Sequence, residues 1–373
     1  MRKTFKFKLY CSKKTKILNQ QINISASIWN HCISLHKQYY KLFGESLNLY
    51  KLQKHITKLK KQDKYNFWKN VPSQAIQDIT ERIDKSYKLF FRNLEHKIKT
   101  SPPKFCSYRK YKSFTLKQSG YTVLDNNRIK IGKQIFKYSK SRNIDGDIKT
   151  LTIKRNRLGE FYICFSVKIE DTPNERIMTG KNAGIDFGLK TFLTFNDGSR
   201  IESPLFYLQY HNELKKLNKQ LSKKLKGSNN WKKTCDRLFR KYQNIINKRR
   251  DHQFKLSKYL TEKYDHIFIE DLNIKAMQQM WGKKISDLSF SSFISILEYQ
   301  SSKNKSIVHK INKWFPSSKT CHLCGTINEN LTLKDRIWKC DCGIEHDRDV
   351  NAAINILREG ASSLGLDNVI PEF

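Results

Sequence analysis

Three acidic residues occupy positions where a folded protein rarely places an unpaired charge. Asp186 lies inside the apolar run 183–189, and Glu270 directly follows the apolar run 267–269. Asp349 stands where apolar residues begin to recur at helical spacing. Removing a carboxylate from water is costly unless a partner compensates for it. The three positions therefore indicate a shared chemical purpose rather than ordinary surface charge.

Carboxylates that converge repel one another unless hard cations neutralise them. Mg²⁺ prefers oxygen ligands and keeps several waters. Two such ions, about 3.5–4 Å apart, can stabilise both the attacking and the leaving oxygen of a phosphodiester displacement. We therefore expect Asp186, Glu270 and Asp349 to hold two Mg²⁺ ions and to cut a nucleic acid backbone.

Each of the three residues also has a simpler structural interpretation. Asp186 suits the end of a strand, Glu270 suits the start of a turn, and Asp349 suits a helix N-cap. Asp347 competes for the third position, and Asp349 is preferred because it is tied directly to the predicted helix start. The catalytic interpretation is favoured only for the three residues together, on a chain this basic.

A second constellation lies near the C-terminus and consists of thiols. Its spacing is C-x2-C, fifteen residues, then C-x-C, formed by Cys321, Cys324, Cys340 and Cys342. Four thiolates at such spacing suit one structural, tetrahedral Zn²⁺, with His322 and His346 as possible substitute ligands. A redox pair or unligated thiols are the alternatives. The total of nine cysteines, odd and clustered, argues against a disulfide framework and for a reducing, intracellular compartment.

The charge of the chain indicates its partner. The 373 residues include 72 Lys and Arg against 34 Asp and Glu, a formal net charge of +38. Such self-repulsion opposes compaction unless a polyanion neutralises it. The charge is spread over the whole chain, which favours nucleic acid over a membrane surface and predicts binding that weakens steeply with salt. The sequence has no apolar run of about 18 residues, and its start, MRKTFKFKLY, lacks the apolar region of a signal peptide.

The elements that position these residues can be read from periodicity. Alternation over residues 5–10 predicts a half-buried strand, and three helical stripes follow, the first ending at Gly44 and the third starting at Pro72. Residues 113–170 predict strands, with a turn at 125–127. We interpret these strands and the N-terminal one as a small β-barrel that the helical block interrupts.

The pattern becomes mixed from about residue 181. Residues 183–195 are strand-like and precede a turn at 196–198. Residues 205–262 predict a long basic helical hairpin that turns at 227–230, followed by a strand at 267–269. A helix over 289–300 and a strand over 306–311 complete the predicted elements.

Several segments resemble TnpB, the accessory nuclease of insertion sequences. Residues 183–191 resemble its first RuvC motif, 267–272 its second and 347–353 its third. Residues 314–321 resemble the entry to its zinc ribbon, and residues 5–10 and 71–75 also match the family. The C-x-C knuckle departs from the usual pattern. The ordered motifs extend over nearly the whole chain.

The resemblance implies an α+β multidomain fold. It has an RNase H-like (RuvC) mixed α/β nuclease domain with an inserted zinc ribbon, and a small β-barrel wedge domain interrupted by a helical recognition lobe. The boundaries that it implies are 1–12 and 101–180 for the wedge, 13–100 for the recognition lobe, 181–315 and 345–360 for the nuclease domain, 316–344 for the ribbon and 361–373 for the tail.

The resemblance also implies function and partners. Members bind a guide RNA from the transposon end, recognise a short motif beside the target, and cut double-stranded DNA in the cytoplasm, at the bacterial or phage nucleoid. The protein reads the shape of the guide–target duplex while base pairing reads its sequence. No membrane partner is expected, and the oligomeric state is left open.

Residues for nucleic acid contact follow by the same likeness. Ser73, Gln74 and Gln77 are candidates for reading the adjacent motif, with a solvated helix face as the alternative. Phosphate contacts are expected from two further groups, Arg109, Lys110 and Lys112, and Lys223, Lys224, Arg249 and Arg250 near the guide–target duplex.

Four other functions compete with this one. A nuclease-dead RNA-guided repressor on the same scaffold is disfavoured because all three acidic positions are filled. A compact type V CRISPR effector would share the chemistry and differ in genomic neighbourhood. A strand-transferring transposase would show the order Asp, Asp, Glu. A plain RNA-binding zinc protein would leave the acidic triad unexplained.

Overall fold

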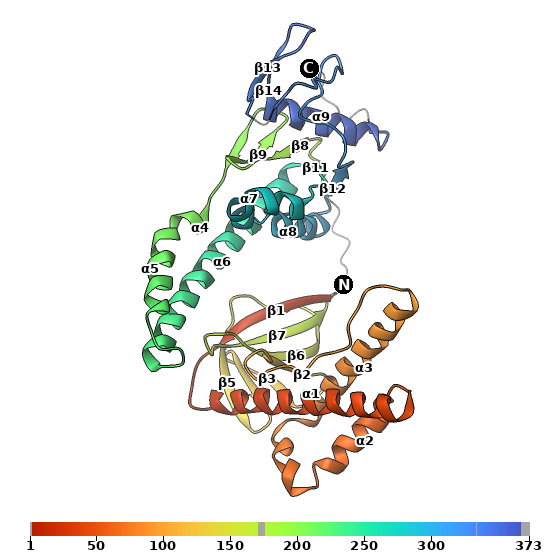
Figure 1. The fold of residues 1–373 in the computed structure, drawn as a ribbon, viewed down its shortest axis with the longest axis vertical. Coiled ribbons are helices and arrows are strands. Elements are labelled where there is room, and N and C mark those ends of the chain that lie inside the picture. Colours follow the sequence, from red (N-terminus) through yellow and green to blue (C-terminus); the bar gives the residue numbers. More distant parts are fainter. Residues whose placement is uncertain (1, 171–175, 333, 367–373) are drawn as a thin grey trace. The chain divides into compact units, whose positions relative to one another are not determined.

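The computed structural model describes residues 2–170, 176–332 and 334–366 of the chain. The chain forms two compact units, Met1–Pro173 and Asn174–Phe373 (Figure 1). Each unit contains its own sheet and its own buried apolar cluster.

The first unit is organised by a seven-stranded antiparallel sheet in the order β2-β6-β7-β1-β5-β4-β3. Its strands are β1 (Arg2–Leu9), β2 (Ser113–Leu116), β3 (Tyr121–Leu124), β4 (Arg128–Ile131), β5 (Gln134–Ser139), β6 (Asp147–Arg155) and β7 (Phe161–Lys168). β1 pairs with β7 on one side and β5 on the other, so the N-terminal strand lies inside the sheet as predicted. The predicted barrel is a nearly closed sheet, with β2 and β3 as its edges.

Alternation explains why one face of this sheet is buried. Phe5, Phe7 and Leu9 of β1 are at most 2% exposed, whereas Lys6 and Lys8 between them are exposed. Successive side chains of a strand point to opposite faces. The apolar face and the helices of the unit share one core cluster.

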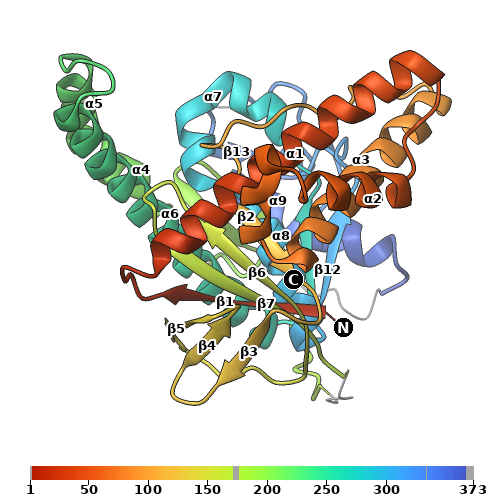
Figure 2. The same ribbon diagram turned by 90° about the horizontal axis from the view of Figure 1, so that it is seen from below.

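The helical block between β1 and β2 follows the predicted stripes closely. It contains α1 (Thr15–Phe43), α2 (Leu49–Leu59), a 3₁₀ helix (Asp63–Asn70) and α3 (Ser73–Glu95). α1 ends at Gly44, whose φ of +67° suits a residue without Cβ. α3 starts one residue later than predicted, because Pro72 is its extended N-cap. α1 crosses one face of the sheet (Figure 2).

The second unit contains a five-stranded sheet in the order β10-β9-β8-β11-β12. Its strands are β8 (Asn182–Phe187), β9 (Thr191–Phe195), β10 (Arg200–Glu202), β11 (His266–Glu270) and β12 (Ile307–Ile311). β8, β11 and β12 are parallel, and β9 and β10 are antiparallel to their neighbours. A two-stranded hairpin of β13 (Ile337–Lys339) and β14 (Glu345–Asp347) flanks the second cysteine pair and leads directly into the last helix.

Helices cover both faces of this sheet (Figure 1). They are α4 (Phe206–Gln209), α5 (His211–Ser222), α6 (Asn229–Lys263), α7 (Ile274–Leu288), α8 (Phe290–Asn304) and α9 (Arg348–Ser362). Ile267 and Ile269 of β11 pack toward α6 and α8, whereas Phe268 between them packs against Ile356 and Leu357 of α9. The sheet is therefore a middle layer, which is the mixed α/β architecture that the sequence predicts.

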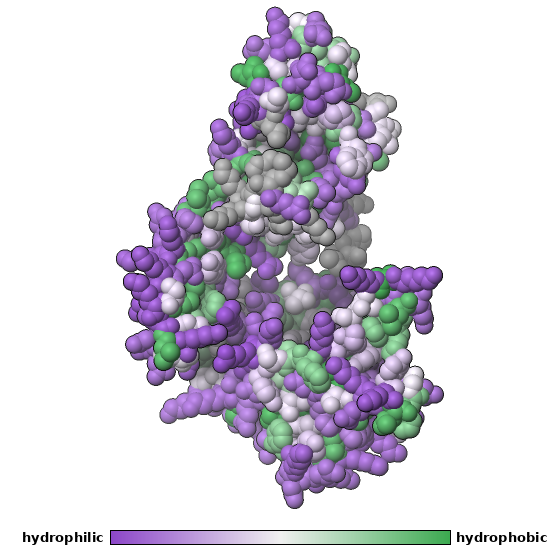
Figure 3. Space-filling view, viewed as in Figure 1, coloured by the Kyte–Doolittle hydropathy of each residue, from purple (hydrophilic) through white to green (hydrophobic). Residues whose placement is uncertain are grey.

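The predicted basic hairpin is present as α5 and α6. Leu214, Leu238 and Ile245 pack together between them. Residues 211–263 carry 17 Lys and Arg against four Asp and Glu. Figure 3 shows these helices largely in the purple of hydrophilic residues. The hairpin is thus held together by a thin apolar seam under a basic surface.

Two local features differ from the predicted elements. The strand-like stretch 183–195 is two strands, because the chain turns at Gly188, where a Cβ would lie 2.5 Å from the Thr191 carbonyl oxygen. The 3₁₀ helix and α7 have no counterpart among the predicted elements. Among the helices that the structure describes, none has both the length and the apolarity needed to cross a membrane.

Candidate active site and metal centre

The sheet of the second unit brings two of the predicted carboxylates together. β8 and β11 are parallel neighbours in a register that places Ile185 beside Ile269. Both isoleucines belong to the cluster beneath α6 and α8. Because side chains alternate along a strand, the next residues, Asp186 and Glu270, lie on the opposite face, which α9 covers. They stand at the carboxyl ends of adjacent parallel strands.

The third carboxylate arrives on α9, which packs directly on β8. A Cβ at Gly184 would lie 2.1 Å from the Ala353 carbonyl oxygen, so helix and strand backbones are in contact there. Asp349 is one helical turn before Ala353, about 5–6 Å along the helix. Asp186 is two residues beyond Gly184 on the same strand face, about 6–7 Å along the strand. Asp349 and Asp186 therefore lie at the same end of the contact between α9 and β8.

The charges of the other two carboxylates act on Asp186. Burial, followed by the charges of Glu270 and Asp349, raises the pKa of Asp186 to about 8, against the opposing effect of Arg348. Burial also raises the pKa of Glu270, opposed by a hydrogen bond that the Ser317 hydroxyl donates to it. Half-buried carboxylates that repel one another gain from a cation that they share. The donor set, oxygen only, fits Mg²⁺.

Arginines border this carboxylate group. Nη1 of Arg336 lies 3.1 Å and 3.2 Å from the two carboxylate oxygens of Asp349. Arg336 is more than half exposed, and it directly precedes β13, between the two cysteine pairs. Sequence patterns did not single it out, since only the pairing of β13 with β14 brings residue 336 beside the start of α9.

The structure gives Asp347 and Asp349, the two candidates for the third carboxylate, different surroundings. Asp347 is the N-cap of α9 and accepts a hydrogen bond from the Val350 amide at 3.0 Å. It also pairs with Arg200 at 2.6 Å. The simpler interpretation of Asp349 as the N-cap is therefore wrong, because Asp347 takes that role. Asp349 lies in the first turn and is the one whose charge reaches Asp186.

The four predicted cysteines come together as a group that can hold a metal ion. The sulfur atoms of Cys321, Cys324, Cys340 and Cys342 all lie within 4.8 Å of one another. Each pair is followed by a glycine with positive φ, +76° at Gly325 and +92° at Gly343, where a Cβ would be strained. Tetrahedral thiolate sites of this kind suit Zn²⁺.

Both nearby histidines act beside the cysteines rather than among them. Nε2 of His346 lies 3.1 Å from the Cys321 sulfur, and its ring packs against Trp338. Nδ1 of His322 lies 3.0 Å from the side-chain oxygen of Asn351. These contacts orient a metal ligand and its surroundings, as second neighbours of metals commonly do.

Two buried asparagines link the cysteine group to the carboxylates. Asn351 and Asn355 of α9 both donate to the Thr320 carbonyl, at 2.7 and 2.6 Å. Asn355 also donates to the Ser317 carbonyl at 2.8 Å, and Ser317 bonds Glu270. The sequence signal for this link is a pair of asparagines four residues apart inside an apolar helix face. The segment before Cys321 is thereby tied to both α9 and Glu270.

The side chains predicted to contact nucleic acid differ in whether they are exposed or already bonded within the fold. Ser73 and Gln77 are exposed, as are Arg109, Lys110, Lys112, Lys223 and Arg250. Gln74 uses its side-chain oxygen to accept hydrogen bonds from the amides of residues 117–119. Arg249 pairs with the buried Asp287 at 2.7 Å, and the Lys224 ammonium donates to Thr234. Contact with nucleic acid stays a prediction for all of them.

Families of known proteins match the segments that carry these sites. Residues 164–280, which include Asp186 and Glu270, match the family OrfB_IS605, described as a probable transposase. Residues 290–356, which include the four cysteines and Asp349, match the Cas12f1-like TNB domain.

Solved structures share the fold of the chain. A Cas12f1 chain, solved with its sgRNA and target DNA, aligns over 93% of this chain and 83% of its own length, with a TM-score of 0.58 and 15% identity. The mini-RNA-guided endonuclease CRISPR-Cas_phi3 aligns over 96% of this chain and 92% of its own, with a TM-score of 0.50 and 11% identity. At such identities the likeness establishes the fold alone.

Curated relatives establish the family. A protein of Streptomyces pristinaespiralis named "Putative RNA-guided DNA endonuclease" is 30% identical over 325 residues, 85% of this chain and 79% of its own. InsQ of Escherichia coli K12, named in the same way, is 24% identical over 92% of this chain and 88% of its own. TnpB-like proteins of Acanthamoeba polyphaga mimivirus match 57% of the chain at 31% identity. The chain therefore belongs to the TnpB family of RNA-guided DNA endonucleases.

Proposed function

We propose that this protein binds a guide RNA derived from a transposon end and cuts double-stranded DNA that pairs with the guide. The observation that carries the proposal is the common face of Asp186, Glu270 and Asp349, two of them in strands and one at a helix start. Membership of a family of RNA-guided endonucleases supports the choice of guide and substrate.

Hydrolysis at this site depends on the three carboxylates. They would hold two Mg²⁺ ions, which supply an activated water and stabilise the leaving 3′ oxygen of the phosphodiester. Ser317 donates to one oxygen of Glu270, which fixes the orientation of that carboxylate. Arg336 is exposed and pairs with Asp349. Once metal ions neutralise that carboxylate, the Arg336 guanidinium can form a hydrogen bond to a phosphate oxygen instead.

The remaining surface is proposed to hold the nucleic acids. The basic arm of α5 and α6, with Lys223 and Arg250 exposed, suits the backbone of a guide–target duplex. Exposed Arg109, Lys110 and Lys112 suit a second phosphate path. Ser73 and Gln77 remain the better candidates for reading the adjacent motif, because the Gln74 side chain already holds residues 117–119.

The domain boundaries and the zinc ribbon belong to the same proposal. The sheet of the first unit would be the wedge domain, and the helices between β1 and β2 the recognition lobe. The four cysteines would hold one structural Zn²⁺. The bonds from Asn351 and Asn355 support a ribbon that stiffens the active site from outside.

The proposal is tested by expressing the protein with the RNA-coding DNA that flanks its gene. We expect the purified protein to carry one RNA with a constant part and a variable end, and to cut a plasmid matching that end. Changing the variable end should change the plasmid that is cut. A protein that purifies without RNA and cuts no matched plasmid would contradict the proposal.

Matched aspartate variants test the active site. Asp349→Asn should abolish cutting while target binding persists, because it removes one metal-binding charge. Asp347→Asn should keep cutting, since asparagine is an equally good N-cap. Asp186→Ala should behave like Asp349→Asn. Equal activity of the two asparagine variants would remove Asp349 from the mechanism.

A further inference from the structure

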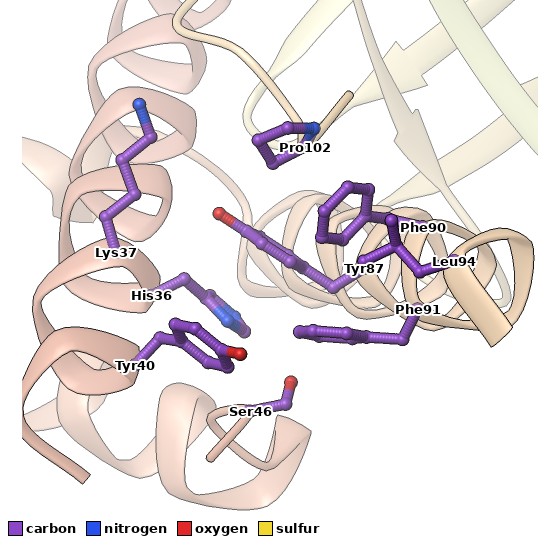
Figure 4. A pocket seen from close by; sticks show the side chains of 9 residues that line it. All are labelled: His36, Lys37, Tyr40, Ser46, Tyr87, Phe90, Phe91, Leu94 and Pro102. Carbon is purple, nitrogen blue, oxygen red and sulfur yellow. The ribbon is translucent and has the colours of Figure 1, made fainter. Parts of the chain in front are cut away.

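The helical block of the first unit contains a cavity that the proposed mechanism does not use. It has a volume of about 270 Å³ and lies between α1 and α3 (Figure 4). His36, Lys37 and Tyr40 line it from α1, and Tyr87, Phe90 and Phe91 line it from α3. Its size lies just below the roughly 300–1,000 Å³ of small-molecule sites. One flat ring system suits this volume better than a stretch of polymer.

Two polar atoms at the cavity are buried without a partner. Nε2 of His36 and the hydroxyl oxygen of Tyr87 make no hydrogen bond to any residue that the structure describes. His36 is 3% exposed and Tyr87 is 7% exposed. Figure 4 draws the Tyr87 hydroxyl directed between Lys37 and Pro102. Burying an unpaired polar atom is costly, so both groups would gain from a partner in the cavity that donates or accepts a hydrogen bond.

The walls of the cavity are aromatic and reach the surface. The rings of His36 and Tyr87 stack with centroids 4.4 Å apart at 11°. Tyr40 is 52% exposed and its ring centroid lies 5.9 Å from that of Phe91. The rim is positive, because exposed Lys37 and Lys41 are one helical turn apart on α1. A planar ligand that carries a negative group is favoured by this combination.

We propose that this cavity receives one unpaired nucleobase of a bound nucleic acid strand, an inference that rests on the proposed function. A base can stack on Tyr40 or Phe91 and present its polar edge to His36 and Tyr87. Its phosphate would then lie toward Lys37 and Lys41. An apolar protein side chain or an acyl chain would fill the walls and leave both buried polar atoms unsatisfied.

The protonation of His36 suits recognition of a neutral ring. Burial lowers the pKa of His36 to about 4, against the nearby charge of Asp84. The imidazole is therefore neutral at physiological pH and can donate or accept at Nε2, depending on its tautomer. The Tyr87 hydroxyl can also do both. The cavity accordingly accepts the mixed donors and acceptors of a base edge.

Photo-crosslinking of the full chain tests this assignment. In one arm the guide RNA carries 4-thiouridine, and in the other arm the target DNA carries 4-thiothymidine at successive positions. We expect crosslinked peptides that contain Tyr40 or Phe91 in one of the arms, which identifies the strand that supplies the base. Crosslinks that occur elsewhere on the protein and never in these peptides would overturn the assignment.

Two substitutions give the quantitative test. Tyr40→Ala should weaken binding of the strand identified above by about 5- to 150-fold, the range for one lost base–aromatic stack. Tyr50→Ala, which removes an even more exposed tyrosine on α2 outside the cavity, is the control and should bind normally. Tyr87→Phe should weaken binding while the melting temperature of the free protein stays equal or rises, because the removed hydroxyl has no partner there.

The outcomes separate this inference from the proposed function. Guided cutting with normal binding by both Tyr40→Ala and Tyr87→Phe would overturn the cavity assignment alone. A protein that neither retains RNA nor cuts DNA would overturn the proposed function and this inference with it. A third outcome is that the free protein forms a dimer, that Tyr40→Ala abolishes the dimer, and that no crosslinks occur in the cavity. This result would overturn the nucleobase assignment and assign the aromatic surface to a second copy of the chain.

Discussion

Replacing Gly184 by alanine tests whether close packing of α9 on β8 positions Asp349 beside Asp186 and Glu270. Gly184 is a strand residue with an ordinary φ, so alanine adds no backbone strain there. The added methyl group would meet the Ala353 carbonyl oxygen at 2.1 Å and both the amide nitrogen and the Cβ of Leu357 at 2.8 Å. Two of these neighbours are backbone atoms, which cannot rotate away. The helix itself must therefore shift.

The size of the shift follows from the contact distance. Real Cβ atoms essentially never come closer than 3.0 Å to such neighbours, so α9 must move by about 0.9 Å. Asp349 moves with it, away from Asp186 and Glu270. A misplacement of about 1 Å costs a catalytic site roughly 100-fold in rate. Overpacking of about 1–3 kcal/mol would lower the melting temperature of a unit this size by about 2–12 °C.

The assay is single-turnover cutting of a matched plasmid by the RNA-loaded protein, with target binding measured in parallel. Gly184→Ala should cut about 100-fold more slowly and bind the target normally. Gly282→Ala is the matched control, because a Cβ at Gly282 meets none of the described atoms within 4 Å. Cutting by Gly184→Ala within a few fold of the unchanged protein would refute the link between helix seating and catalysis.

Three further perturbations have defined outcomes. Arg336→Gln should slow cutting by about 100-fold, as loss of one charge-stabilising donor does, whereas Arg200→Gln, which loses only its pair with Asp347, should cut normally; equal rates would exclude a role for Arg336 at the phosphate. Metal analysis should find one Zn²⁺ per chain, and Cys321→Ser should lose that zinc and lower the melting temperature; a zinc-free, fully stable protein would end the ribbon proposal. Because burial holds the pKa of His36 near 4, below its ordinary 6.5, the unfolded chain takes up a proton first, so stability should fall between pH 6.5 and 4, and His36→Gln should flatten that slope in pH-dependent melts.

Sequence periodicity predicts the elements that carry the carboxylates because their burial pattern is local. Asp186 and Glu270 each interrupt or end an apolar strand, and this is visible in a few consecutive residues. The predicted start of the last helix then favours Asp349 over Asp347 as the third carboxylate. The spacing of the cysteines likewise depends on short turns, and the structure confirms that the four sulfur atoms come together.

Contacts between distant segments are what the sequence does not reveal. Arg336 reaches Asp349 only because two short strands pair, and Ser317 reaches Glu270 across 47 residues of chain. Gln74 and Arg249 illustrate the converse, since both look like free polar side chains on a helix and both are bonded within the fold. Charge alone does not distinguish a cation that faces solvent from one that neutralises a buried aspartate.

The position of α9 in the order of synthesis has a biological consequence. Chains emerge from the ribosome with N-terminal segments first. β8 and β11 are therefore made long before α9, and the face that carries Asp186 and Glu270 stays without its third carboxylate until residues after 347 appear. A nascent chain, or one interrupted within the cysteine segment, contains the basic arm of α5 and α6 but lacks Asp349 of the proposed active site. The topology thus leaves the proposed cutting centre incomplete until translation of the chain is nearly finished.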